Sequence, residues 1–278
     1  MRGSRLRKRA IFLFNNITAM IVVACFLFPY AYFVASAFKS RLDTFAYPPV
    51  WVFRPTLENF QTILEDMDIL FYMKNSTIIA AISTLLTLVV AVPAAYSFAR
   101  FRFRFKESIA YGFLFLQMVP GISIVFALFY IARTLKLFDT HMFLILSYLL
   151  WNVPYAIWML RGFAEAIPVD LEESAMVDGC SRFRAFLLIT LPLMSGGLAA
   201  SAILIFIGTW NEFALAFFLT STRARTMPTT IAFFMTHAGI KWGPMFAAAA
   251  IGTLPVVVFA LVVRKYFISA LTFGAVKG

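Results

Sequence analysis

Six long apolar stretches, separated by short polar segments, dominate the pattern of hydrophobic and polar positions along this chain. A helix needs about 20 mostly apolar residues to cross a bilayer, and each stretch is about that long. The pattern therefore predicts an all-α integral membrane protein, with residues 1–278 forming one transmembrane domain. The predicted spans lie at about residues 11–37, 75–98, 109–131, 142–160, 192–210 and 245–263.

The first apolar stretch follows five basic residues and superficially looks like a secretory signal, with Ala35-Ser36-Ala37 in the place of a cleavage site. Signal cores have only about 7–15 apolar residues, and this run is longer. We therefore interpret it as an uncleaved membrane anchor.

Composition and charge agree with a membrane protein. Hydrophobic residues make up 62% of the chain and charged residues 13%, whereas soluble domains have roughly 25% charged residues. The 24 basic residues outnumber the 13 acidic ones, but they cluster at the ends of the apolar stretches. We therefore interpret the basic residues as determinants of membrane orientation and not as a nucleic-acid site. The positive-inside rule then places both termini in the cytoplasm, and Lys39–Lys74 and Ser221–Gly243 outside.

The polar loop 161–191 falls on the cytoplasmic side, although it carries five acidic and three basic residues. Within it, Asp170 has N-cap character, and Glu173 three residues later completes a capping-box pattern. Gly179 suits the end of a helix. We predict a short, exposed helix there, which would be a natural docking element for a soluble partner.

The same loop carries a family resemblance. Glu173-Ser174-Ala175, then Gly179, then Ile189 and Leu191-Pro192 match the spacing Glu-Ala-Ala, three residues, Gly, nine residues, Ile-x-Leu-Pro. This spacing resembles the coupling loop of permeases in binding-protein-dependent ATP-binding-cassette (ABC) importers. With the Trp-Asn-Glu stretch at 210–212 and the C-terminal Leu271–Gly278, the chain looks most like the smaller membrane subunit of maltose-type carbohydrate transporters.

The resemblance implies a type I ABC importer permease in the bacterial cytoplasmic (inner) membrane. Its implied partners are a second homologous permease subunit, two ATP-binding subunits, an extracytoplasmic solute-binding protein, a carbohydrate-like solute and the lipid bilayer. Transport would follow alternating access. The residues implied in coupling to the ATPase are Glu172, Glu173, Ser174, Ala175, Asp178, Gly179, Leu191 and Pro192.

Within this loop, Ser174, Ala175 and Gly179 would permit a close approach of the ATPase. Glu172, Glu173 and Asp178 would meet basic groups on its surface.

Polar residues beside helix breakers mark a possible substrate path. Gln117 lies near Pro120-Gly121, Asn152 lies near Pro154, and Pro255 interrupts the sixth stretch. Unpaired backbone groups at such points are tolerated where they are buried in protein or face water, so they would suit a transport path, although ordinary kinking is an equal alternative.

The triplet Trp210, Asn211 and Glu212 ends the fifth stretch. An acid at membrane depth is costly and usually functional, and an indole beside amide and carboxylate groups suits a sugar. The alternative is an interfacial anchor, with the Trp at headgroup level.

The sequence contains no Gly-x4-Gly-Lys-Ser/Thr phosphate loop, so we expect no ATPase site and no cofactor on this chain, and ATP-Mg on the partner ATPase. It also shows no catalytic triad and no metal-ligand cluster, so the chain is interpreted as a transport subunit and not an enzyme. The alternative function, an ion-coupled secondary transporter, would require paired carboxylates at mid-membrane, which the apolar stretches lack.

Overall fold

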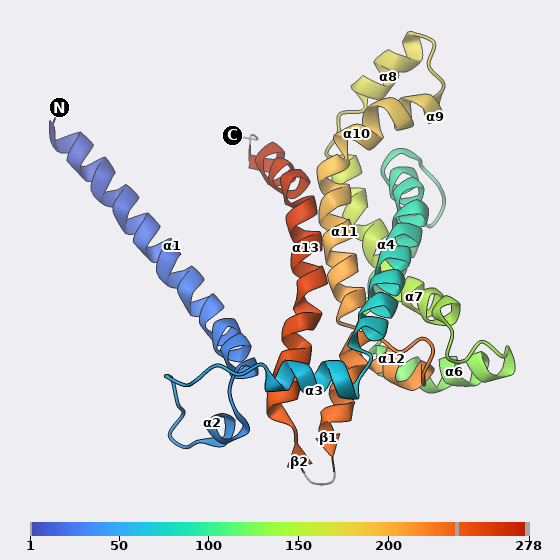
Figure 1. Ribbon diagram of the computed structural model, residues 1–278. Coiled ribbons are helices and arrows are strands. Elements are labelled where there is room, and N and C mark those ends of the chain that lie inside the picture. Colours follow the sequence, from blue (N-terminus) through green and yellow to red (C-terminus); the bar gives the residue numbers. More distant parts are fainter. Residues whose placement is uncertain (1, 237–238, 276–278) are drawn as a thin grey trace. The chain divides into compact units, whose positions relative to one another are not determined.

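The computed structural model describes the backbone of residues 2–236 and 239–275, and the side chains of residues 11–236 and 239–263. The basic side chains of residues 2–9 and 264–277, and most of the C-terminal segment 271–278, therefore lie outside the description. The elements, most of which are labelled in Figure 1, are α1 (Arg2–Ala37), α2 (Arg41–Phe45), α3 (Glu58–Asp66), α4 (Ile69–Arg100), α5 (Lys106–Met118), α6 (Gly121–Thr134), α7 (His141–Glu165), α8 (Asp170–Val177), α9 (Arg182–Ala185), the π-helix η1 (Phe186–Thr190), α10 (Leu191–Leu193), α11 (Ser195–Trp210), α12 (Ala214–Leu219), the 3₁₀-helix η2 (Met227–Phe234), β1 (Met235–Thr236), β2 (Gly239–Ile240) and α13 (Trp242–Ala275).

Long apolar helices confirm the predicted all-α membrane architecture. Within the described residues, four helices are long and apolar enough to cross a membrane: Ile11–Ala37, Ile69–Arg100, His141–Glu165 and Trp242–Val263. Two further pairs of helices pass the same test but are sharply bent, and counting each pair as one span gives six. The predicted number of spans is therefore consistent with the structure.

The predicted third span is not a straight helix, and a second bend lies at the start of the predicted fifth span. Lys106–Met118 and Gly121–Thr134 meet at 91°, and Arg182–Leu193 and Ser195–Trp210 meet at 69°. At the first break, Val119 and Pro120 are extended, because proline has no N–H and disfavours a helical residue before it. Pro154 and Pro255, by contrast, lie inside continuous helices, so the breaks expected at these two positions are absent.

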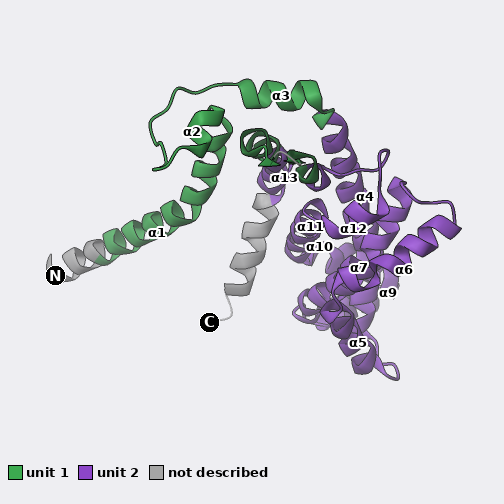
Figure 2. Ribbon diagram, turned by 90° about the horizontal axis from the view of Figure 1, so that it is seen from below, with its two compact units in different colours: residues 1–69, 231–251 green, residues 70–230, 252–278 purple. Residues whose placement is uncertain are grey.

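The chain forms two compact units (Figure 2). Unit 1 contains residues 1–69 and 231–251, and unit 2 contains residues 70–230 and 252–278. In unit 1, the Asn59 amide donates to the carbonyl oxygens of Ala37 and Lys39, at 2.9 and 2.8 Å, and so fixes α3 against the end of α1. The antiparallel strands β1 and β2 pair Met235 with Ile240.

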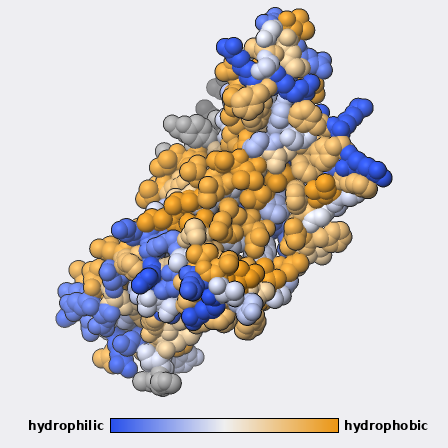
Figure 3. Space-filling model, turned by 90° about the vertical axis from the view of Figure 1, so that its right-hand side faces the viewer, coloured by the Kyte–Doolittle hydropathy of each residue, from blue (hydrophilic) through white to orange (hydrophobic). Residues whose placement is uncertain are grey.

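Unit 2 is held together by two clusters of buried side chains. One joins α4, α5, α7 and α11 and contains many alanines, which let the helix backbones approach closely. The other joins α4, α6, α7 and α12 around Leu144 and Leu219. In Figure 3, hydrophobic side chains dominate the middle of the visible face, and hydrophilic ones gather toward its upper and lower ends.

Contact between α7 and α11 depends on Gly197, because a Cβ at this position would overlap the Phe163 ring. We expect Gly197→Val to destabilise the folded protein by about 1–3 kcal/mol through overpacking. Gly208→Val in the same helix is the matched control, since its Cβ would meet nothing within 4 Å. Thermal unfolding of the two purified variants tests this, and equal melting temperatures would contradict it.

Candidate functional site

The helix predicted in the polar loop is present as α8, and Gly179 ends it as expected. Gly179 has φ +91°, in the left-handed region where a residue without Cβ is favoured. Its N–H donates to the Met176 carbonyl at 3.1 Å, and the Cys180 N–H donates to the Ala175 carbonyl at 2.9 Å. These two bonds form a Schellman motif, so the last carbonyl groups of α8 are satisfied within the chain.

The predicted capping box at the start of α8 is wrong. Val169 is the N-cap, it makes no side-chain capping bond, and Asp170 is the first residue of the helix. Asp170, Glu172 and Glu173 all lie in the first turn. Acidic residues there interact favourably with the positive end of the helix dipole. This interaction stabilises the start of α8, which is the role that the predicted capping box would have had.

Glu172 lies at the centre of a buried polar network. Arg100 Nε donates to its Oε1 at 2.7 Å, and Thr190 Oγ1 donates to the same oxygen at 2.7 Å. Tyr96 OH donates to Oε2 at 2.6 Å. The side chains of Arg100 and Glu172 are 4% and 2% exposed. The network therefore joins α8 to the end of α4 and to η1.

Burial raises the pKa of Glu172, but the hydrogen bonds from Tyr96, Thr190 and Arg100 outweigh it, so the pKa lies below its usual value. The carboxylate stays charged and paired with Arg100. The expectation that Glu172 meets basic groups on a partner is therefore corrected: a buried acid that is already paired inside the chain presents no charge at the surface.

The exposed side of the segment consists of other residues. Glu173, Ser174, Asp178 and Gly179 are exposed, and Ala175 is half-buried. Val177 and Phe183 add apolar surface, at 86% and 70% exposed, and the sequence analysis missed both. The signal in the sequence that could have identified them is their position among charged residues in a short amphipathic segment. The segment thus presents acidic and apolar groups together.

The Ile-x-Leu-Pro end of the motif lies where the chain returns to the membrane helices. Leu191 is partly buried against the α4–α5–α7–α11 cluster, and Pro192 is exposed. The preceding residues form the π-helix η1, which places Thr190 at the Glu172 carboxylate. Leu191 thus packs inside the chain, and Pro192 alone of the pair remains accessible.

The polar residues predicted along a substrate path all contact α7 or α11. Gln117 Nε2 donates to the Trp151 carbonyl at 2.7 Å, and Asn152 Nδ2 donates to Thr209 Oγ1 at 2.9 Å. Gln117 is exposed and Asn152 is half-buried. These side chains bridge neighbouring helices, while Gln117 also keeps access to its surroundings.

Each residue of the Trp-Asn-Glu triplet makes different contacts. Trp210 is 4% exposed and its Nε1 donates to the Gly252 carbonyl at 3.1 Å, so it is a buried packing residue and not an interfacial anchor. Asn211 is exposed, and its amide donates to the Ile207 carbonyl at the end of α11.

The half-buried carboxylate of Glu212 accepts from the N–H groups of Leu215 and Ala216, at 2.9 and 3.1 Å, and from Tyr148 OH at 3.0 Å. Glu212 therefore caps α12 and ties it to α7.

A second carboxylate site was not predicted. Asp139, between α6 and α7, accepts from the four consecutive backbone N–H groups of residues 221–224, at 2.9 to 3.1 Å. Burial raises the pKa of Asp139, but these bonds outweigh it and lower the pKa to about 2. Nearby, Asn75 Nδ2 donates to the carbonyls of Arg223 and Arg225, both at 2.9 Å, and Ser76 Oγ accepts from Met227 N–H at 2.7 Å. The segment 221–227 is thus fixed to α4 and to the α6–α7 turn.

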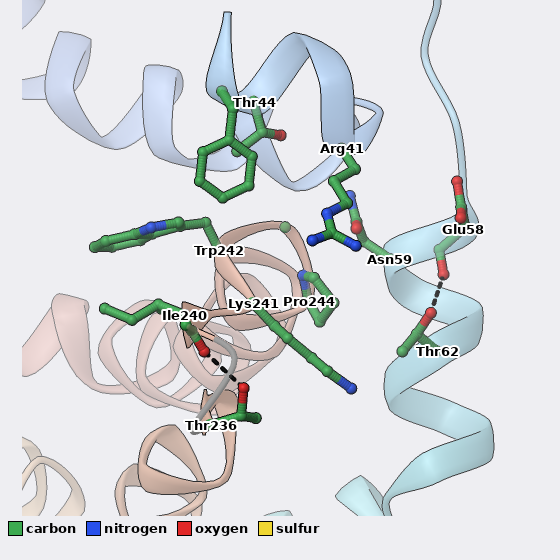
Figure 4. A pocket seen from close by; sticks show the side chains of 13 residues that line it. Arg41, Thr44, Glu58, Asn59, Thr62, Thr236, Ile240, Lys241, Trp242 and Pro244 are labelled. Carbon is green, nitrogen blue, oxygen red and sulfur yellow. Dashed lines mark hydrogen bonds between the residues drawn. The ribbon is translucent and has the colours of Figure 1, made fainter.

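In unit 1, a cavity of about 280 Å³ brings together the two segments that the charge pattern placed outside. Arg41, Glu58 and Lys241 bring charged groups to it from three separate parts of the chain (Figure 4). Trp242 and Asn59 also line it. Its lining therefore combines both signs of charge with an aromatic face.

Residues 83–272 match the family described as binding-protein-dependent transport system inner membrane component. The chain belongs to this family. It is a permease subunit of an ABC importer, embedded in the inner membrane as a multi-pass protein, and its family assigns ATP hydrolysis to separate subunits. The alternative of an ion-coupled secondary transporter is therefore discarded.

Two relatives cover nearly the whole permease. It is 39% identical over 266 residues to the trehalose/maltose transport system permease protein MalG of Thermococcus litoralis, covering 94% of this chain and 95% of that protein. It is 34% identical over 275 residues to the diacetylchitobiose uptake system permease protein DasC of Streptomyces coelicolor, covering 98% and 100%.

Solved structures show the same fold. A chain of a bacterial ABC transporter involved in the import of the acidic polysaccharide alginate matches with a TM-score of 0.71 and 19% identity, covering 93% of this chain and 97% of that one. A chain of the MetNI methionine ABC transporter matches with a TM-score of 0.61 and 12% identity, covering 77% and 99%. The predicted type I importer architecture is therefore confirmed.

Removing the Glu172 carboxylate should loosen α8, because Arg100 would be left as a buried, unpaired charge. We expect Glu172→Ala to cost about 3–5 kcal/mol of local stability. Glu173→Ala, on the exposed side of the same turn, removes only a favourable charge at the helix start and should cost about 0.3–1 kcal/mol. Hydrogen exchange of the α8 amides in the two variants measures the difference, and similar protection in both would argue against the network as the anchor of α8.

Proposed function

We propose that this permease forms half of the translocation path for a carbohydrate or related solute and is driven through the α8 segment. The observation that carries the proposal is the combination of a firmly anchored helix with an exposed acidic and apolar face. An ATPase that binds this face would move the helices to which Glu172 is bonded. The cycle would be alternating access.

The partners of the proposed assembly follow from the single coupling segment on this chain. Two ATP-binding subunits, each holding ATP-Mg, need two such segments, so a second homologous permease would supply the other. Exposed Glu173 and Asp178 would meet basic groups on the ATPase, and Val177 and Phe183 would fill an apolar groove. Exposed Ser174 and Gly179, with half-buried Ala175, would allow close approach.

A carbohydrate is the favoured class of solute. The names of the relatives support it, because they are permeases of trehalose/maltose, diacetylchitobiose and, in Agrobacterium fabrum, sulfoquinovosyl glycerol systems. A solute-binding protein would deliver the solute, and the charged cavity of unit 1 offers it a docking surface. Gln117, Asn211 and Glu212 keep exposed or half-buried polar groups that would contact the passing solute.

Replacing Gly179 tests the coupling role. We expect Gly179→Val to assemble in the membrane but to lose ATPase association and solute uptake, because a β-branched residue in the left-handed region costs about 1–2 kcal/mol and misplaces the end of α8. Gly179→Asn is the matched control, since Asn tolerates this backbone conformation. Co-purification of the ATPase and uptake of radiolabelled sugar are the measurements. Wild-type values for Gly179→Val would refute the coupling assignment.

Replacing Glu212 tests the path. A glutamine keeps the shape but removes the charge and one good acceptor, so Glu212→Gln should change uptake kinetics severalfold while ATPase association stays intact. Glu165→Gln, at the end of α7 with a 44% exposed side chain, is the control and should leave uptake unchanged. If substitutions at Trp210, Asn211 and Glu212 all preserve uptake kinetics, these residues serve the fold alone.

The proposed orientation places both termini in the cytoplasm. Cysteines introduced singly at Ser4, Glu58 and Lys241, after replacement of Cys25 and Cys180 by serine, report the side of each segment. In intact cells, an impermeant thiol reagent should label positions 58 and 241 and spare position 4. The reverse pattern would invert the topology.

A further inference from the structure

A cavity of about 220 Å³ lies in unit 1 beside the end of α1. Phe28 and Tyr32 of α1 form one side, and Trp51 and Phe53 of the following segment form the other. Among the described residues that line it, Lys39 alone carries a charge. The cavity therefore has an apolar body with one cation.

Lys39 is buried without an acidic partner. The residue is 3% exposed, and its Nζ lies 4.7 Å from the centre of the Tyr32 ring and 5.3 Å from that of Phe53. It forms no ion pair with any described residue, and Asp43, the nearest acid along the chain, accepts from Ser40 Oγ at 2.8 Å. Aromatic rings offset only part of the cost of desolvating an ammonium, so an anion would complete the site.

The backbone around Lys39 is fixed by hydrogen bonds. Asn59 Nδ2 bonds the carbonyl oxygens of Ala37 and Lys39, and the Thr56 N–H donates to the Phe38 carbonyl at 2.8 Å. A second cavity of about 160 Å³ shares Tyr32 and Lys39 with the first. Lys39 thus lines both cavities.

We propose that this site binds an anionic phospholipid, with the phosphate at Lys39 Nζ and an acyl chain along Phe28, Tyr32 and Trp51. The surroundings match a membrane interface: Phe28, Trp51 and Val52 are 57%, 62% and 93% exposed, and Tyr47 is 97% exposed. Aromatic residues favour the headgroup level, and the Lys39 ammonium would attract the negative phosphate of a lipid headgroup. Because α1 is itself a candidate span, lipid chains border the apolar part of the cavity.

The test uses the complete importer, purified with its partner subunits and stripped of native lipid. Native mass spectrometry measures bound phosphatidylglycerol, phosphatidylcholine and free sn-glycerol 3-phosphate for the wild type, Lys39→Met, Lys39→Arg and Lys74→Met. Methionine keeps the length of the side chain but not its charge, and Lys74 is an exposed lysine on α4. We expect Lys39→Met to weaken phosphatidylglycerol binding about fivefold, because the loss of one charge pair at about 4 Å costs roughly 1 kcal/mol in water. Lys39→Arg and Lys74→Met should retain it.

Several results would overturn the proposal. Equal phosphatidylglycerol binding by Lys39→Met and the wild type would show that Lys39 does not hold the headgroup. Equal binding of glycerol 3-phosphate and of the lipid would assign a free-anion site. A photoreactive residue at position 51 should form a lipid adduct in native membranes, and a cross-link to the second permease instead would mean that protein covers the cavity. The cross-link readout also remains valid if Lys39→Met fails to assemble.

Discussion

A buried carboxylate beside a buried guanidinium determines how α8 is attached to the membrane helices. Removing Glu172 and Arg100 from water costs several kcal/mol for each ion, and their mutual attraction offsets this only when the remaining polar atoms are also satisfied. Here they are: Tyr96 and Thr190 donate to the carboxylate, and Arg100 Nη2 donates to the Ile167 carbonyl at 2.8 Å. Pulling α8 away from α4 would expose two desolvated charges. The two helices therefore move together.

The other end of α4 carries a second polar anchor. Asn75 and Ser76 hold the segment 221–227, which Asp139 also binds through four backbone N–H groups. Residues 76 and 96 are separated by 20 positions of one helix, which is about 30 Å at 1.5 Å per residue. The polar network at Glu172 and the 221–227 segment are thus joined by one continuous helix, which contains Pro93.

The sequence allowed the apolar helices, the end of α8 and the family to be predicted, because each depends on local pattern. Helix length follows from the apolar run, and Gly179 marks a backbone conformation that few other residues adopt. The burial of Glu172 was not predictable in this way, since its partner Arg100 lies 72 residues earlier and only tertiary packing brings them together.

Dependence on tertiary packing also explains why the effect of each proline and the contacts of Asp139 were not predicted. Pro120 lies at a break between two helices, whereas Pro154 and Pro255 lie within continuous ones. The presence of a proline alone therefore does not determine whether a helix is broken. Asp139 receives its backbone donors from more than 80 residues away.

Glu212 illustrates how a structural role would constrain the proposed transport role. Its oxygens already accept three hydrogen bonds, from Tyr148 and from the first turn of α12. A carboxylate has about four lone-pair sites, so capacity for roughly one further donor remains, and the side chain is only half-buried. In the proposed path, a solute hydroxyl would therefore bind without breaking the cap. A stronger pull on the carboxylate would uncap α12 and release its contact with α7, so binding at Glu212 and the packing of α12 against α7 are energetically linked.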